Sequence, residues 1–290
     1  MKRCLPYLMA LALAAPAPAA GLYPALTLAH PGVLPLGPRD QAWEDDPSAL
    51  AEAPAWDLRA GLEGFDAAWG EAYYLSGAKG LGDEGGYGLR YAQATDAPPA
   101  AAQGGQASVL GGGFGWPLGY GVSGGLSLWQ ASGDVSQASL VGVGLRWAMA
   151  EHLLSVNGLW SKDGAARPVR AGLEGPLGGA WCYGAVVDAD GAGLQSAQAL
   201  LGWGPVRVFQ RYSEGRHSSW AGLVWEGPSW GLQALAGYGV EDQWMGRLAL
   251  TLSSIHGDAG VDQKSPQFTL GWRSWEATPP ALTQDVPDNN

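Results

Sequence analysis

Stretches of alternating apolar and polar residues run through most of the chain, each followed by Gly, Pro, Asp or Ser. In 139–147, for example, Val141, Val143, Leu145 and Trp147 alternate with Leu140, Gly142, Gly144 and Arg146. The same period of two runs through 87–92, 122–128, 230–238, 243–253 and 268–273, and more weakly through 57–63, 167–175 and 195–203. This period is typical of β-strands with two different faces. The pattern therefore predicts an all-β protein with short connections, such as a hairpin between 218–226 and 227–239.

The two faces of these strands differ in kind. The apolar face often ends in Trp or Tyr, and the other face carries Gly, Ser, Thr, Gln and Arg. The wet face of a soluble sandwich normally carries many charges, whereas only 15% of this chain is charged. A transmembrane barrel has an outer apolar band flanked by aromatic girdles and a polar interior, and closure satisfies its backbone in lipid. We therefore expect a transmembrane antiparallel β-barrel of about 14 strands (range 12–16) over residues 55–275. A soluble sandwich, propeller or solenoid is the alternative.

Composition narrows the alternatives. The 46 glycines have no three-residue period, which excludes collagen, and they are too many for a long helical bundle. A hydrophobic content of 47% with 15 tryptophans can bury enough apolar surface to avoid disorder. The net charge of -11, with no basic run beyond Lys2-Arg3, excludes nucleic acid as a partner.

The two ends of the chain differ from its middle. Residues 1–20 have the features of a signal peptide: Lys2 and Arg3, an apolar run over 5–15, and Ala17-Pro18-Ala19 as a cleavage site. Its removal would leave Cys182 as the single cysteine, so no intrachain disulfide is expected. Residues 21–54 form an extension rich in Pro and Ala with an acidic run at 44–46, and 276–290 form a polar tail.

Residues 45–50, Asp-Asp-Pro-Ser-Ala-Leu, are followed by Pro54-Ala55 just before the first predicted strand. This stretch resembles the start of outer-membrane barrels in the long-chain fatty-acid transporter superfamily and their relatives in type nine secretion. Ala53 and Trp56 depart from the pattern, which usually has Asn and Gly there. The resemblance implies a fourteen-stranded barrel in which residues 21–54 fold inward as a plug, with Asp45, Asp46, Pro47 and Ser48 as the plug motif. Either aspartate is suited to cap a turn or short helix.

Charged residues recur on the polar face of the predicted strands, where they would line the lumen. The candidates are Arg59, Glu63, Arg90, Arg146, Arg170, Glu174, Arg207, Arg247 and Arg273, with Arg211 on the same face. An interior lined by arginine would suit pairing with the acidic run at 44–46. Two interpretations stay open: a charged lumen that selects solutes, or internal ion pairs that fill the barrel.

The sequence offers no clear catalytic or metal site. None of His30, His152, His217 and His256 has a partner at metal-ligand spacing. His217 and Ser219 would share a strand face, but no third group is evident to orient them. Residues 111–115, Gly-Gly-Gly-Phe-Gly, are not followed by a helix, so close packing or a bulge inside the barrel is expected in place of a phosphate loop. We therefore expect no enzyme activity, no cofactor and no bound metal.

Most tryptophans are predicted to anchor the barrel at the membrane interfaces, with sugar stacking as the alternative. These are Trp69, Trp116, Trp147, Trp203, Trp225, Trp230, Trp244 and Trp272. Together the patterns predict a barrel in the outer-membrane bilayer of a diderm bacterium, acting as a passive pore or transporter for small hydrophobic or polar solutes. A non-conducting structural or secretion-partner barrel is one alternative, and an exported soluble β-rich protein that binds carbohydrate is another.

Overall fold

The fold is described from a computed structural model of the chain. It describes residues 43–64, 71–97, 105–133, 137–161, 164–213, 216–226, 230–239, 244–252, 255–262 and 265–274. The predicted signal peptide, most of the extension at 21–54 and the tail at 276–290 lie outside these ranges. Within them the chain is all-β, with two short 3-10 helices, η3 (Pro47–Glu52) and η4 (Gly82–Glu84). No helix in the described ranges is long and apolar enough to cross a membrane.

The described residues contain sixteen β-strands. They are β1 (Trp56–Gly64), β2 (Glu71–Gly80), β3 (Gly86–Ala97), β4 (Gly105–Gly119), β5 (Val122–Gly133), β6 (Gln137–Met149), β7 (His152–Ser161), β8 (Gly164–Gly178), β9 (Trp181–Asp190), β10 (Gly193–Trp203), β11 (Val206–Ser213), β12 (Arg216–Glu226), β13 (Trp230–Gly239), β14 (Trp244–Leu252), β15 (Ile255–Asp262) and β16 (Ser265–Ser274).

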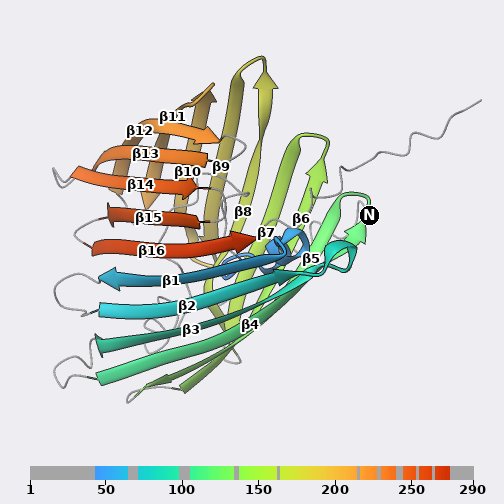
Figure 1. Cartoon of the computed structure of the whole chain (residues 1–290), viewed down its shortest axis with the longest axis vertical. Helices are drawn as coiled ribbons and strands as arrows, with labels where there is room; N and C mark the ends of the chain where they lie inside the picture. The colour runs from blue at the N-terminus through green and yellow to red at the C-terminus, as the bar shows by residue number, and fades with distance from the viewer. Residues whose placement is uncertain are drawn as a thin grey trace, which may run out of the picture.

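Every strand pairs antiparallel with its neighbours in the sequence, and the last strand pairs with the first. β16 pairs with β1 in a register that runs from Trp56↔Ser274 to Glu63↔Gln267, so the sheet closes into a barrel. Figure 1 shows the blue β1 beside the red β16. Sixteen strands among the described residues correct the expected fourteen and reach the upper end of the range. Short strands without clean alternation, such as β15 with its sequence IHGDAGVD, give too weak a period-two signal to be counted reliably.

The predicted faces are found in β3, β5 and β6. In β6, the large apolar residues from Val141 to Trp147 are exposed at every second position, and the residues between them are buried. The alternation places Leu, Val and aromatic side chains on the outside of the barrel and Gly, Ser and Arg on the inside. The outer surface is therefore apolar, and the charged groups described below lie within the barrel.

Several connections at one end of the barrel are tight turns. Between β4 and β5, Gly119, Tyr120 and Gly121 have φ values of 89°, 53° and 72°, and Tyr120 is 99% exposed. The β6–β7, β8–β9 and β10–β11 connections lie at this same end, as do the start of β1 and the end of β16. We call it the turn end. Outward-facing Trp147, Trp181 and Trp203 lie close to it.

Among the described residues, the interior contains two separate apolar clusters. The first joins Trp43 and Leu50, from the segment before β1, to Trp129 and Leu140 on β5 and β6. The second joins Leu200, Phe209, Trp220 and Leu235 on β10–β13, with the Phe209 and Trp220 rings stacked at 5.5 Å. The first cluster ties the N-terminal segment to one wall of the barrel.

Candidate functional site

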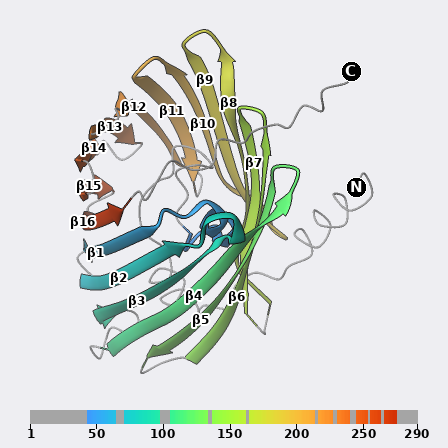
Figure 2. The ribbon, with the colours of Figure 1, turned by 45° about the vertical axis from the view of Figure 1, so that its right-hand side comes forward.

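The segment at 43–55 turns into the barrel before β1 begins. Its helix η3 packs against β2–β6, and most extensively against β4, β5 and β6. In Figures 1 and 2 the blue coil of η3 lies on the inner side of these strands. Asp46 caps η3, because its Oδ1 accepts hydrogen bonds from Ser48 N at 3.1 Å and Ser48 Oγ at 2.5 Å. Pro47 follows at the first helical position, where it needs no donor.

A row of glycines forms the wall beneath this segment. Gly86, Gly115, Gly125 and Gly144 are successive cross-strand partners on β3, β4, β5 and β6, and all face inward. We call them the glycine row. A Cβ at Gly115 or Gly125 would overlap the backbone of Pro47–Ala51, and one at Gly144 would overlap the Asp46 carboxylate. The absence of side chains therefore lets the segment's backbone approach the wall closely. Gly115 belongs to the stretch at 111–115, for which close packing was the expectation.

Trp43 extends the contact along the wall. Its ring stacks on that of Trp129 with centroids 5.6 Å apart and an interplanar angle of 11°, and both side chains are buried. The Trp129 indole donates to Ser127 Oγ at 3.0 Å. Sequence reasoning missed this pair because it assigned tryptophans to the outer interfaces. The alternation of the strand could have revealed it, because Trp129 falls on the face opposite to that of the outward Leu126 and Leu128.

Three inward arginines lie against the acidic run at 44–46. The Arg146 Nε is 2.6 Å from Asp46 Oδ2, and both side chains are buried. The Arg170 Nη1 is 3.8 Å from Asp45 Oδ2, while its Nε and Nη2 donate to Asp188 at 2.7 and 3.1 Å. These arginines are far from the acidic run in the sequence, so their contacts link β6 and β8 to the segment. A buried charge is tolerated only when it is paired in this way.

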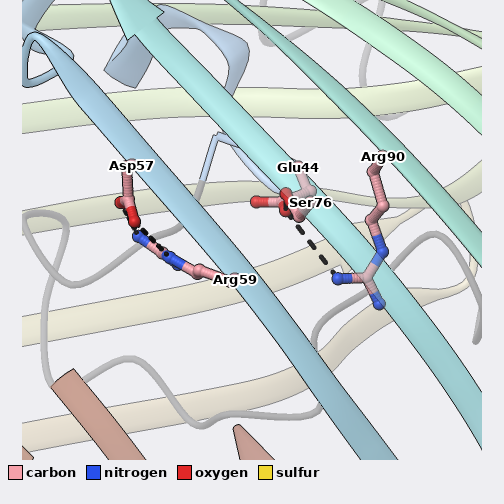
Figure 3. A network of polar contacts seen from close by, with 5 residues as sticks. All are labelled: Glu44, Asp57, Arg59, Ser76 and Arg90. Atoms are coloured by element: carbon pink, nitrogen blue, oxygen red, sulfur yellow. Dashed lines mark hydrogen bonds and ion pairs between the residues drawn. The ribbon is translucent and has the colours of Figure 1, made fainter. Parts of the chain in front are cut away.

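The third contact joins Glu44 to β3. Figure 3 shows Glu44 and Ser76 together, with a dashed line to the Arg90 guanidinium group. Ser76 Oγ donates to Glu44 Oε1 at 2.5 Å, and Arg90 Nη1 lies 3.7 Å from the same oxygen. We call Arg90, Arg146 and Arg170 the arginine row. Each member faces one carboxylate of the run 44–46, and the Asp46–Arg146 contact is the shortest of the three.

The other predicted lumen residues lie outside the arginine row, although Arg59 is the cross-strand partner of Ser76 and so lies beside Glu44. Arg59 pairs with Asp57 on the inner face of β1, at 2.6 Å between Nη2 and Oδ2 (Figure 3). Arg207 lies near the turn end, where its Nη1 donates to the carbonyls of Gly204 and Val206. Glu174 lies on the inner face of β8, opposite the buried Leu153. The side chains of Glu63, Arg247 and Arg273 lie outside the described residues.

Some buried polar atoms in and beside the acidic run and the arginine row make no hydrogen bond within the described residues. Glu44 Oε2, Arg170 Nη1 and Ser155 Oγ are buried and make no hydrogen bond within the described residues. Ser155 lies directly opposite Arg146 across the β6–β7 pair, so the two side chains belong to the same inner wall. The arginine contacts of Glu44 and Asp45 are longer than the arginine contact of Asp46.

The histidines and Ser219 are the remaining candidates for catalysis or metal binding. Among the described residues no group of three or more His, Cys, Asp and Glu could hold a metal ion. The His152 Nδ1 lies 3.1 Å from Tyr183 Oη, and Ser219 Oγ accepts a hydrogen bond from Gln210. His217 packs against the ring of Tyr212, with centroids 5.1 Å apart. His30 and the His256 side chain lie outside the described residues.

The predicted interface tryptophans divide into two groups. Trp147, Trp203 and Trp225 are outward and 44–56% exposed, and Trp116 is outward and partly exposed. Trp69 and the side chains of Trp230, Trp244 and Trp272 lie outside the described residues. The structure thus places three of the predicted anchors on the outer face, and their position at a membrane interface stays a prediction.

No protein-family model and no curated protein matches the chain. Among solved structures, the chain is similar to a KdgM porin in complex with disordered oligogalacturonate, at 8% identity over 76% of this chain and 99% of the other, with a TM-score of 0.35. It is also similar to the outer membrane protein Omp33 of Acinetobacter baumannii, at 10% identity over 77% of this chain and 100% of the other, with a TM-score of 0.40. A third is the toluene transporter TodX of Pseudomonas putida, at 11% identity over 78% of this chain and 89% of the other, also with a TM-score of 0.40.

Proposed function

We propose that this protein is a transport barrel of the bacterial outer membrane, and that the segment 43–55 is a plug that restricts passage through the lumen. The solutes would cross passively once the plug moves away from the wall. The observation that carries the proposal is the contact of the buried Asp46 carboxylate with Arg146, which ties a segment outside the sheet to the inner face of β6.

The outer surface supports the location in a membrane. Leu89, Leu128 and Leu248 are more than half exposed, although large apolar side chains of a protein in water are normally buried. They lie on the outer face of β3, β5 and β14, and exposed tryptophans flank this face at the turn end. An apolar band flanked by aromatic residues is what a lipid bilayer requires of a barrel.

The size of the barrel and the attachment of the segment at 43–55 support a lumen whose passage the segment restricts. Barrels of about sixteen strands are wide enough to leave an aqueous channel inside. The segment at 43–55 is attached to the wall by polar and aromatic contacts to β2–β6 and by the contact of Asp45 with Arg170 on β8, and within the described residues its helix η3 packs mainly against β2–β6. A segment fixed on one side could leave the wall without disrupting any strand pairing.

Conductance of single barrels in a planar bilayer tests this function. The chain without the predicted signal peptide at 1–20, which we call the mature chain, should give small or rare channel openings. Arg146→Gln should give larger and longer ones because Asp46 loses its partner. Arg207→Gln is the matched control, since it removes an inward arginine that does not contact the segment. Heat-modifiable mobility on gels should show that all three proteins are folded.

A non-conducting barrel is the second candidate, and the apolar cluster of Leu200, Phe209, Trp220 and Leu235 favours it because it fills part of the interior with packed side chains. Silence of the mature chain and of Arg146→Gln in the bilayer, with both proteins folded, would overturn the transport function in favour of this one. A mature chain that is monomeric in buffer without detergent would contradict both.

A further inference from the structure

The plug presents three consecutive carboxylates to the inner wall, and each faces a different arginine of the arginine row. The arginines come from β3, β6 and β8, so no local sequence motif holds them together. The guanidinium group is a fixed fork of donors that matches the geometry of a carboxylate. With the plug displaced, the same wall would offer its donors to any solute carrying carboxylates.

The plug does not use all the donors of this wall. Ser155 Oγ is 0% exposed, lies on the same wall as Arg146, and makes no hydrogen bond. Arg170 Nη1 is also without a hydrogen bond and lies 3.8 Å from Asp45. Buried donors in folded proteins almost always have a partner. Ser155 lies opposite Arg146 and Arg170 Nη1 lies beside Asp45, so this wall keeps hydrogen-bonding capacity that the plug leaves unused.

We infer that the arginine row is a binding site for solutes with two or more carboxylates, and that the plug's run 44–46 occupies this site when the solute is absent. The inference rests on the proposed function and names its substrate class. Solute binding and plug docking are then mutually exclusive, since both need Arg90, Arg146 and Arg170. Neutral and cationic solutes would gain nothing from this wall.

This exclusion has a measurable consequence. The plug is tethered to the barrel, so it competes for the site at an effective concentration in the millimolar range. The apparent dissociation constant of a free ligand then equals its intrinsic value divided by the fraction of protein whose site is open. Removing the plug's charges should therefore increase the affinity of a free polycarboxylate, whereas removing a wall arginine should decrease it. A purely structural ion-pair network predicts neither change.

Isothermal titration of the detergent-solubilised mature chain with citrate tests the inference. We expect Glu44→Gln/Asp45→Asn/Asp46→Asn to bind citrate at least tenfold more tightly than the unmodified chain. Glu52→Gln/Asp83→Asn/Glu84→Gln is the matched control, because it removes three exposed acids and changes the net charge equally. It should bind citrate as the unmodified chain does.

The wall is tested by adding Arg170→Gln to the plug variant, which should weaken citrate binding at least tenfold, while adding Arg207→Gln should not. Equal affinity in the unmodified chain and the plug variant would overturn the inference, as would indifference to Arg170→Gln. Sucrose serves as the neutral probe, and binding as strong as that of citrate would also refute the assignment. Because binding is measured without conductance, a silent barrel that still binds citrate contradicts the transport function alone.

Discussion

The Asp46 carboxylate meets Arg146 Nε at 2.6 Å, a contact between residues a hundred positions apart in the chain. The same carboxylate also caps η3 through Ser48. The Asp46 side chain thus caps the start of η3 and also attaches this helix to the inner wall. Because the two roles use different oxygens, they can be separated by mutation.

Asp46→Asn should remove the charge and keep the cap, since asparagine is an equally good N-cap. We expect the free energy of opening of the segment to fall by about 3 kcal/mol, because Arg146 is left buried without its closest partner. Hydrogen exchange at the amides of Ala49 and Ala53, which donate to the carbonyls of Asp46 and Leu50, measures this opening.

Asp46→Ala should cost about 1 kcal/mol more than Asp46→Asn, because the cap is lost as well. Arg146→Gln combined with Asp46→Asn should recover part of the loss, as expected for two residues that act through one contact. Unchanged protection at Ala49 in both single variants would show that the ion pair does not hold the segment.

The glycine row gives a steric prediction. Gly125→Ala places a methyl group against the backbone of Pro47 and Ser48, so we expect the segment to be displaced at a cost of about 1–3 kcal/mol. Limited proteolysis within 43–55 should become faster, and the barrel should keep its heat-modifiable mobility.

Gly112→Ala is the matched control for this steric effect. Gly112 lies on the outer face of β4, where an added methyl group meets the movable side chain of Leu89. Its proteolysis rate should equal that of the unmodified chain. Equal rates in the two alanine variants would mean that the glycine row does not support the segment.

An outward charge tests the lipid-facing band. Leu128 is 66% exposed on β5. If this residue lies near the bilayer midplane, Leu128→Arg should make the free energy of folding into lipid vesicles less favourable by about 2–4 kcal/mol. Tyr120→Arg, at the β4–β5 turn, should cost no more than about 1 kcal/mol, because charges near the interface are tolerated. Equal effects of the two substitutions on folding would place the outer face in water.

Cys182 is a natural probe of the interior. It faces inward on β9, next to Gly202 and Arg207, and it is the single cysteine among the described residues. A charged thiol reagent should therefore label it in barrels reconstituted into vesicles. In a Cys182→Ser background, Leu201→Cys on the outer face should resist the same reagent. Faster labelling of the outward cysteine would reverse the assignment of the faces.

The alternating pattern was enough to predict an all-β chain, its two faces and the inward phase of Arg90 and Arg146. These follow from the period of two, which each strand carries in its own sequence. The strand number was underestimated, because a short strand such as β15 carries small and acidic residues in place of a clear apolar face.

The details of the plug could not be derived from the pattern. The glycine row exists only through the register of four strands, and register is a relation between segments that no single segment specifies. The stacking of Trp43 on Trp129 likewise depends on where the N-terminal segment lies in three dimensions. The match between the acidic run and an arginine-lined interior could be expected, but the pairing of each carboxylate could not.

The pairing of β1 with β16 has a consequence for the order of assembly. The other pairings in the described chain join sequence neighbours and can form as successive hairpins, whereas this one joins the first strand to the last and carries the largest loop-closure entropy. It is therefore the seam that forms last. Residues 43–55 are joined directly to β1, one of the two strands of this seam, so closing the barrel also fixes the point from which the segment enters it.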